Sequence, residues 1–129
     1  MSELQRVMLV EDDKDIRTVA TMALEMVGGL KVHACESGAQ ALETVAAFAP
    51  QLVLLDVMMP GMTGPEVLNA LRQREDTRVL PVVFLTAKAQ DAEVAHLKGL
   101  GALDVIAKPF DPMTLSDALK KLWEGRPVA

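Results

Sequence analysis

Polar side chains that can bind a metal ion or a phosphoryl group follow four short apolar runs of the sequence. Carboxylates follow two of these runs, a threonine follows another, and a lysine with a proline follows the last. The residues are Glu11, Asp12 and Asp13, then Asp56, then Thr86, and finally Lys108 and Pro109. If the runs are parallel strands of one open sheet, the residues after them meet at one edge. The pattern therefore predicts a single polar site built from four separate segments.

The carboxylates of this set favour a divalent cation. Two carboxylates about 4 Å apart repel each other by roughly 4 kcal/mol at the effective dielectric of a protein surface. Asp12 and Asp56 would therefore need a positive charge beside them. Mg²⁺ suits them because it takes hard oxygen ligands and commonly binds one or two carboxylates together with a phosphoryl oxygen. Ca²⁺ suits them less well, since no loop supplies enough oxygens for its larger coordination shell.

Each of these residues taken alone has an ordinary structural explanation. An acidic residue after a strand commonly caps the following helix, and Asp12 or Asp13 could do this. Thr86 could be a plain strand-end hydroxyl, and Lys108 a solvated surface charge. However, four strand ends carry such residues at once. This coincidence favours one phosphoryl-transfer site built from all of them over a separate explanation for each.

The elements that must position these residues alternate between short β-branched runs and longer amphipathic stretches, which is typical of βαβ units. The strand candidates are residues 7–10, 31–35, 52–55, 82–85 and 105–107. Most of them are continuous apolar runs, as expected for a parallel sheet covered on both faces, whereas the second alternates and is expected at an edge. Five such units predict an α/β fold with a doubly wound, five-stranded parallel sheet and helices on both faces.

Five helices are expected between and after these strands. The apolar face of the first, which should end at the following glycine pair, comprises Ile16, Val19, Ala20, Ala23, Leu24 and Val27. The second is expected over residues 38–48, and the third begins at Gly64 with Pro65 in its first turn. The fourth is weakly patterned. The fifth is expected to begin at Asp111 as the N-cap, with Pro112 after it.

Length and composition limit the classes of function. The chain of 129 residues is half hydrophobic, which is enough for one core but too short for two ordinary domains. A net charge of -5 argues against nucleic acid or an anionic membrane as the main partner. The lone Cys35 cannot form an internal disulfide. Together with the lack of a signal-peptide core or an apolar span, this predicts a cytoplasmic protein.

The chain resembles the receiver domain of two-component response regulators over nearly its whole length. The resemblance is carried by Glu11-Asp12-Asp13, Asp56-Val57-Met58-Met59-Pro60-Gly61-Met62-Thr63-Gly64, Thr86-Ala87 and Lys108-Pro109-Phe110. It implies a flavodoxin-like sheet with strand order 2-1-3-4-5. It also implies a receiver domain over residues 1–125, a C-terminal tail over 126–129 and a cis bond before Pro109.

The resemblance further implies a role for each residue of the site. Asp56 would be the phosphoacceptor, which takes a phosphoryl group from a phosphohistidine and becomes an aspartyl phosphate. The implied Mg²⁺ ligands are Asp12, Asp56 and the backbone carbonyl of Met58, with Glu11 acting mostly through water. The implied partners of the phosphoryl oxygens are Lys108, the Thr86 hydroxyl and the Ala87 N–H. Asp13 is left with a capping or accessory role, and Gly61 and Gly64 with roles in the turn.

Such a domain is a signalling switch and not an enzyme in the ordinary sense, although it phosphorylates itself and hydrolyses its aspartyl phosphate. The implied partners are a sensor histidine kinase or a histidine phosphotransfer protein, docking on residues 14–22 and 108–112, and a downstream protein target. A monomer or a weak phosphorylation-dependent homodimer is expected. Met58, Met59 and Met62 beside the site suggest an adaptable docking surface, with Met59 the most readily explained as a packing residue.

The switch residues depart from the family pattern at one position. In the family, the threonine moves toward the phosphoryl group and an aromatic residue three positions before the lysine fills the space. Here those two positions are Thr86 and Val105, and a small branched side chain displaces much less surface than a ring. We therefore expect the loop over residues 88–93 and the fourth helix to carry more of the response.

Several alternatives stay open on the sequence alone. One is a pseudo-receiver, which would keep the fold without being phosphorylated. Another is that the chain is a domain of a longer regulator or hybrid kinase, although its Met1 start and short tail favour a stand-alone form. An aspartate-nucleophile phosphatase is disfavoured because Met58 stands where a second Asp is needed. FMN binding is disfavoured because acids, and not a glycine loop, follow the first strand.

Overall fold

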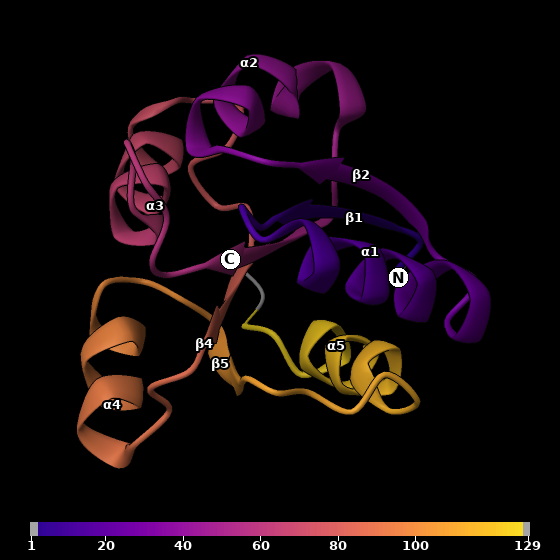
Figure 1. Cartoon of the computed structure of the whole chain (residues 1–129). Helices are drawn as coiled ribbons and strands as arrows, with labels where there is room; N and C mark the ends of the chain where they lie inside the picture. The colour runs from indigo at the N-terminus through magenta and orange to yellow at the C-terminus, as the bar shows by residue number, and fades with distance from the viewer. Residues whose placement is uncertain (1–2, 128–129) are drawn as a thin grey trace.

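The computed structural model describes residues 3–127, in which parallel strands and helices alternate along the chain (Figure 1). The strands are β1 (Arg6–Val10), β2 (Lys31–Cys35), β3 (Leu52–Asp56), β4 (Val82–Thr86) and β5 (Asp104–Ala107). The helices are α1 (Lys14–Met22), continued by the π-helical segment η1 (Ala23–Val27), then α2 (Gly38–Phe48), α3 (Gly64–Gln73), α4 (Asp91–Gly99) and α5 (Leu115–Glu124).

All five strands form one parallel sheet in the order β2-β1-β3-β4-β5. In the register of the central strands, Val7 of β1 lies beside Val32 of β2 on one side and Leu52 of β3 on the other. The predicted fold class, the strand order and the edge position of the second strand are thus confirmed. The order reverses between β1 and β3, which is where open α/β sheets carry their ligand sites.

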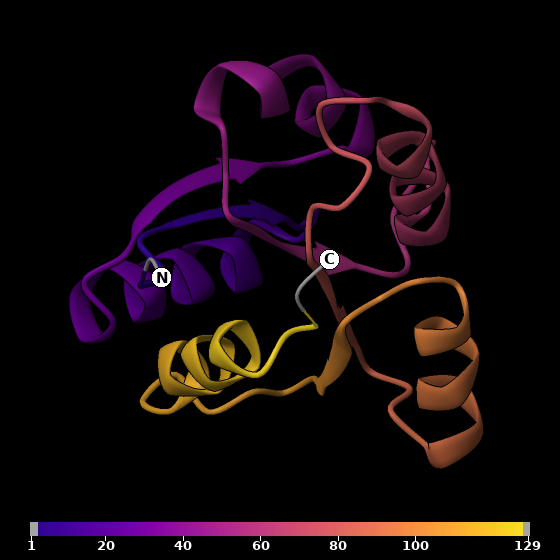
Figure 2. The same ribbon diagram turned by 180° about the vertical axis from the view of Figure 1, so that it is seen from behind.

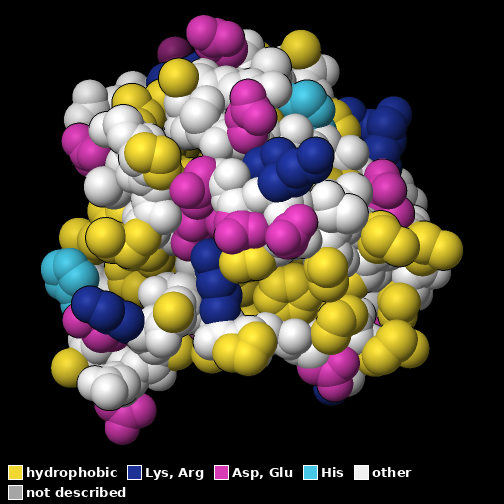
Figure 3. All heavy atoms as spheres, in the orientation of Figure 1, with side chains coloured by type: hydrophobic (Ala, Val, Ile, Leu, Met, Phe, Trp, Pro, Cys, Tyr) yellow, Lys and Arg dark blue, Asp and Glu magenta, His cyan; other side chains and the backbone are white. Residues whose placement is uncertain are grey.

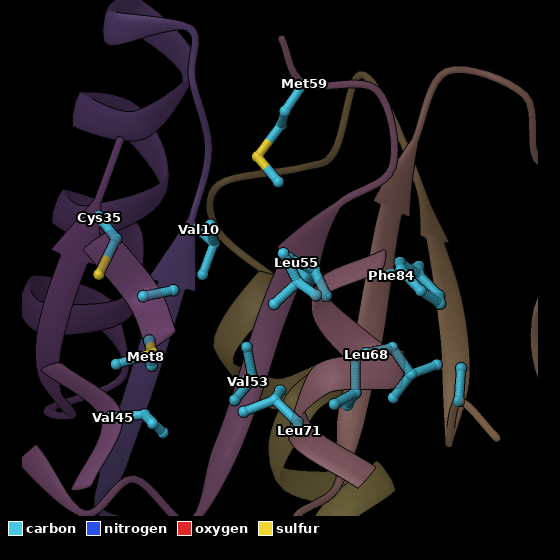
Figure 4. Packing of buried hydrophobic residues seen from close by; sticks show 14 of the residues in the cluster. Met8, Val10, Cys35, Val45, Val53, Leu55, Met59, Leu68, Leu71 and Phe84 are labelled. Atoms are coloured by element: carbon cyan, nitrogen blue, oxygen red, sulfur yellow. The ribbon is translucent and has the colours of Figure 1, made fainter. Parts of the chain in front are cut away.

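Helices cover the sheet on both faces, and each face has its own hydrophobic core (Figures 1 and 2). On one face, side chains of α2, α3 and α4 pack against alternate residues of the strands, among them Met8, Val53 and Phe84 (Figure 4). On the other, α1 and α5 pack against the intervening residues, such as Leu9 and Leu54. Every residue of β3 and β4 is buried, which explains their continuous apolar sequences.

The first helix differs from its prediction near its end. Ala20, Ala23 and Leu24 are buried as expected, but Val19 and Val27 are exposed. For Val27 the cause is the π-helical segment η1, in which the Gly28 N–H donates to the carbonyl of Ala23, five residues earlier. Val19 lies before that segment, in the regular part of the helix. The wider turn changes which side chains face the sheet, so a regular helical repeat overestimates the apolar face.

The start of the fifth helix was also predicted wrongly. The helix α5 begins at Leu115, and Asp111 is not its N-cap. The Asp111 carboxylate instead accepts a hydrogen bond of 2.9 Å from the Met113 N–H, while its backbone carbonyl accepts from Thr114 and Leu115. An aspartate that accepts from a backbone N–H two residues later forms a turn, and this turn uses the residues expected to be the first helical turn.

Two further expectations concern the limits of the chain. Among residues 3–127, no helix has the length and apolar character required to cross a bilayer. The predicted division into a receiver domain over residues 1–125 and a tail over 126–129 stays a prediction, and the last two residues of that tail lie outside the part of the chain that the structure describes.

Candidate functional site

The ends of four strands bring the predicted site residues to one edge of the sheet. Glu11 directly follows β1 and Lys108 directly follows β5, whereas Asp56 and Thr86 are the last residues of β3 and β4. The strands that carry Asp56 and Thr86 are neighbours, with Asp56 in register beside Leu85. The side chains of Glu11, Asp56 and Thr86 are all buried, while Asp12 is exposed at the mouth of the site.

Three carboxylates form a cluster that can hold a metal ion. One oxygen from each of Glu11, Asp12 and Asp56 lies within 4.8 Å of the other two. Since Mg²⁺ binds oxygens at about 2.1 Å, two ligands of one ion lie about 3 to 4 Å apart, which needs only a small contraction of this cluster. The ligand atoms are all hard oxygens, so the donor set fits Mg²⁺ in its chemistry as well. Figure 3 shows acidic side chains gathered near the centre of one face, next to a basic side chain.

Lys108 supplies the positive charge that the two buried carboxylates need. Its ammonium lies 2.8 Å from Glu11 Oε1 and 2.9 Å from Asp56 Oδ1. The contact with Glu11 is an ion pair without the geometry of a directed hydrogen bond, whereas Asp56 accepts a hydrogen bond. Burial works against the charged ammonium, but the two carboxylates outweigh it and raise the pKa of Lys108. The peptide bond between Lys108 and Pro109 is cis, as the resemblance implied.

Glu11 is the most deeply buried charged group of the site. None of its side chain is exposed, and its second oxygen accepts a hydrogen bond of 3.1 Å from the Asp13 N–H. Burial raises the pKa of Glu11 to about 7, although Lys108 and the Asp13 N–H favour the ionised form. Asp13 itself caps α1, because its carboxylate accepts from the Ile16 N–H at 3.0 Å. The capping role expected for Asp13 is therefore confirmed.

Thr86 links the site to the loop that follows β4. Its side chain is buried, and its hydroxyl oxygen accepts a hydrogen bond of 3.0 Å from the Lys88 N–H. Its backbone carbonyl accepts from the Lys108 N–H at 2.8 Å, which ties the loops after β4 and β5 together. Val105 is half-buried in β5 and lies in register beside Phe84 of β4. A displacement of the Thr86 side chain would therefore act directly on the backbone of the β4–α4 loop.

The loop after β3 differs in part from its prediction. Met58 is 74% exposed, but Met59 is buried in the core shown in Figure 4, so the three methionines do not form one exposed surface. Gly61 has a φ of 79°, which confirms it as a turn residue. Gly64 is the first residue of α3, as predicted, and a Cβ there would lie 2.3 Å from the Asp56 carbonyl oxygen. Its φ is not positive, so what this position requires of glycine is close packing against Asp56 and not an unusual backbone conformation.

Two positioning features were missed from the sequence. Thr63 and Glu66 form a capping box at the start of α3, in which each side chain accepts from the backbone N–H of the other. Their spacing, a threonine followed three residues later by a glutamate, could have revealed it. Arg17 donates to the backbone carbonyl of Glu11 at 2.8 Å and holds the loop after β1. No sequence pattern indicates that contact.

Comparison with known proteins gives one family and two groups of relatives. A model of the response regulator receiver domain family matches residues 7–120. The phosphate regulon transcriptional regulatory protein PhoB of Pseudomonas aeruginosa is 37% identical over 114 residues, which are 88% of this chain and 49% of that protein. The DNA-binding response regulator MtrA of Mycobacterium tuberculosis is 40% identical over 111 residues, which are 86% of this chain and 47% of that protein.

Solved structures of similar proteins cover nearly all of the chain. Chemotaxis protein CheY4 of Vibrio cholerae superposes with a TM-score of 0.84 at 28% identity, covering 92% of this chain and 98% of that one. A sensor protein from Polaromonas sp. JS666 gives a TM-score of 0.82 at 30% identity, covering 93% and 96%. The chain spans about half the length of the curated relatives above. MtrA is named as a DNA-binding protein and PhoB as a transcriptional regulator, which differs from our expectation of no nucleic acid partner.

Proposed function

Because the chain belongs to the response regulator receiver domain family of two-component signalling, we propose that Asp56 accepts a phosphoryl group with the help of bound Mg²⁺. The resulting aspartyl phosphate would switch the binding of a partner protein. The observation that carries the proposal is that Asp56 is buried beside both a lysine and two further carboxylates. Asp56 is only 3% exposed, its carboxylate is ion-paired with Lys108, and it lies in one cluster with Glu11 and Asp12.

The proposed reaction uses the Asp56 carboxylate as the nucleophile. One of its oxygens forms the new bond to phosphorus while the bond from phosphorus to the histidine nitrogen of the donor breaks, and the nitrogen then takes a proton from solvent. No separate base is required, because an ionised carboxylate has no proton to lose. Lys108, the Thr86 hydroxyl and the backbone N–H of Ala87 would stabilise the charge on the phosphoryl oxygens. The contact of Lys108 with Asp56 and the burial of Thr86 support this proposal.

The residues that would hold the metal ion are those of the carboxylate cluster and the loop after β3. Asp12, Asp56 and the backbone carbonyl of Met58 would bind it directly, and Glu11 through water. Bound Mg²⁺ supplies positive charge to the carboxylates and to one phosphoryl oxygen. Lys108 holds Asp56 Oδ1 and so orients the same carboxylate from the other side.

The proposed donor is a sensor histidine kinase or a histidine phosphotransfer protein, and the proposed receiver of the signal is a further protein. Cytoplasmic location, the monomeric or weakly dimeric state and the absence of direct nucleic acid contact belong to the same proposal. Thr86 and Val105 would be the switch residues. Since the Thr86 hydroxyl holds the Lys88 N–H, we propose that its movement is passed to the β4–α4 loop through that hydrogen bond, in place of an aromatic side chain.

The test is incubation with acetyl phosphate and Mg²⁺, followed by intact-protein mass spectrometry. We expect the wild type to gain the mass of one phosphoryl group and the Asp56→Asn variant to gain none. Removal of Mg²⁺ with EDTA should abolish the gain. Asp13→Asn is the matched control, because Asp13 lies beside the cluster but caps α1, and asparagine caps a helix equally well. An unmodified wild type would contradict the proposal and support the pseudo-receiver.

A further inference from the structure

A groove lies at the end of the sheet where β4 and β5 begin, opposite the end that carries the carboxylate cluster. Its volume is about 1010 Å³, and its walls come from the loop before β4, the loop before β5 and the end of α5. Figures 1 and 2 both show β4 and β5 between α4 and α5. Because these strands are parallel, their first residues lie at one edge, while Thr86 and Lys108 lie at the other. The groove is therefore separate from the proposed phosphorylation site.

The floor of the groove is apolar. Four of its side chains also belong to the two hydrophobic cores, namely Leu80, Ala102, Leu103 and Leu122, and Pro81 adds to the apolar lining. Val79, which is 75% exposed, also lines the groove and extends its apolar surface. A groove of this kind can bury one or two large apolar side chains of a partner.

Basic side chains surround this apolar floor. The lining residues include four cations, Arg72, Lys98, Lys121 and Arg126, and two anions, Asp76 and Asp104. Asp76 is already paired with Arg74 at 3.3 Å. None of the four cations forms an ion pair with a carboxylate within residues 3–127. The groove is therefore positive in a chain whose net charge is -5.

The walls of the groove are held in place by backbone contacts of one of these cations. The Arg72 guanidinium donates to the Leu80 carbonyl at 2.7 Å and to the Gly101 carbonyl at 3.2 Å. It thereby joins the loop before β4 to the loop before β5. On the opposite wall, the Arg126 guanidinium lies 3.4 Å from the centre of the Trp123 ring. Lys98 and Lys121 are exposed and are the cations best able to meet a ligand.

We infer that this groove docks an acidic segment of a partner protein that carries large apolar side chains. The apolar side chains would lie on the floor, and carboxylates would meet Lys98, Lys121 and Arg126. A nucleic acid fits less well, because the groove offers an aliphatic floor in place of a row of aromatic stacking partners, and the rest of the chain is acidic. The inference does not depend on phosphorylation of Asp56.

The test uses the single tryptophan of the chain, Trp123, which lines the groove. The probe is a short synthetic peptide of leucine and phenylalanine set among glutamates. Its affinity is measured by Trp123 fluorescence and its location by amide chemical shifts. We expect shifts in residues 72–81, 98–104 and 121–127, and binding that weakens as salt is raised. A peptide with lysines in place of the glutamates should not bind.

Charge reversal provides the decisive variant. Lys98→Glu combined with Lys121→Glu should weaken peptide binding by about ten-fold, since two attractive contacts become repulsive. The matched control is Lys31→Glu. Lys31 is an exposed lysine on β2, the outer strand on the side of the sheet away from β5, and this variant should bind as the wild type does. Asp56→Asn should also bind normally. Equal binding of both peptides, an unaffected double variant, or preference for a DNA oligonucleotide or a second copy of the chain would overturn the inference.

Discussion

Lys108 is the residue on which the buried charges of the site depend. Two carboxylates share its ammonium, at 2.8 Å and 2.9 Å, and both are nearly or wholly buried. Removing one member of a buried ion pair leaves a charge without compensation, which costs more than the pair itself contributes. The lysine therefore has a structural effect that is separate from any contact with a phosphoryl group.

We predict that Lys108→Met lowers the free energy of unfolding by about 3 kcal/mol in the absence of Mg²⁺. Added Mg²⁺ should restore more stability to this variant than to the wild type, because the carboxylate cluster then lacks any other cation. Urea unfolding with EDTA and with MgCl₂ measures both effects. Lys14→Met, which removes an exposed lysine of α1, should change stability by less than about 0.5 kcal/mol. Equal stabilities of the two variants would contradict the assignment.

The Thr86 hydroxyl has a second, local role that a variant can isolate. Thr86→Val keeps the shape of the side chain but leaves the Lys88 N–H without its acceptor. A net hydrogen bond contributes about 1 kcal/mol, so the Lys88 amide should exchange with solvent several-fold faster. Thr86→Ser, which keeps the hydroxyl, should retain the slower exchange. Hydrogen exchange followed by NMR compares the two, and identical rates would show that the hydroxyl does not hold the loop.

At the scale of elements, the position of Asp56 is set by how closely α3 approaches the end of β3. Gly64 begins α3 and lies against the Asp56 carbonyl, and the capping box of Thr63 and Glu66 fixes the direction of the helix there. The Gly64 N–H also donates to the Val57 carbonyl at 2.9 Å. The position of Asp56 thus depends on a glycine at residue 64.

Gly64→Ala should therefore lower the free energy of unfolding by about 2 kcal/mol and slow phosphorylation by acetyl phosphate, because its Cβ would meet backbone and the Phe84 ring at 2.9 Å. The control is Gly99→Ala in α4. Apart from its own helix backbone and chain neighbours, no atom of residues 3–127 lies within 4 Å of a Cβ at position 99, so alanine there should stabilise the protein by about 0.5 kcal/mol. Thermal unfolding separates the two. A Gly64→Ala protein as stable as the wild type would show that α3 can move away.

The elements also show how far the sequence predicts the fold. The strands were predictable because they are short runs rich in β-branched and other apolar residues, and two of them, β3 and β4, are fully buried. The end of α2 at Phe48 agrees with its prediction. The end of the first helical stretch at Gly28 also agrees with its prediction, but its apolar face and the start of α5 do not. At η1 the helix widens, and at Asp111 a side-chain hydrogen bond makes a turn. In both places a local backbone arrangement outweighs the repeat of apolar residues, which is the only signal that periodicity offers.

At the scale of the whole molecule, the site residues could be predicted because the parallel topology brings strand ends together. Glu11, Asp56, Thr86 and Lys108 come from four segments, and no local pattern would join them without the sheet. The depth of Glu11, its pairing with Lys108 and the support from Arg17 could not be predicted, since they depend on side-chain directions at the end of the strands. The opposing groove was missed for the same reason, because its cations are far apart in the sequence.

A metal ion that binds only the folded chain must stabilise the whole molecule. Once the Mg²⁺ concentration exceeds the dissociation constant, each ten-fold increase should raise the free energy of unfolding by about 1.4 kcal/mol, from mass action alone. Urea unfolding across a series of MgCl₂ concentrations at constant ionic strength measures this slope. Asp12→Asn should abolish most of it, since Asp12 supplies one of the three clustered carboxylates, whereas Asp13→Asn should keep it. An equal slope in both variants would show that the ion binds elsewhere. Asp12 and Asp13 are adjacent and both exposed, so a general effect of salt on surface charge would change the two variants alike, whereas an ion in the carboxylate cluster would not.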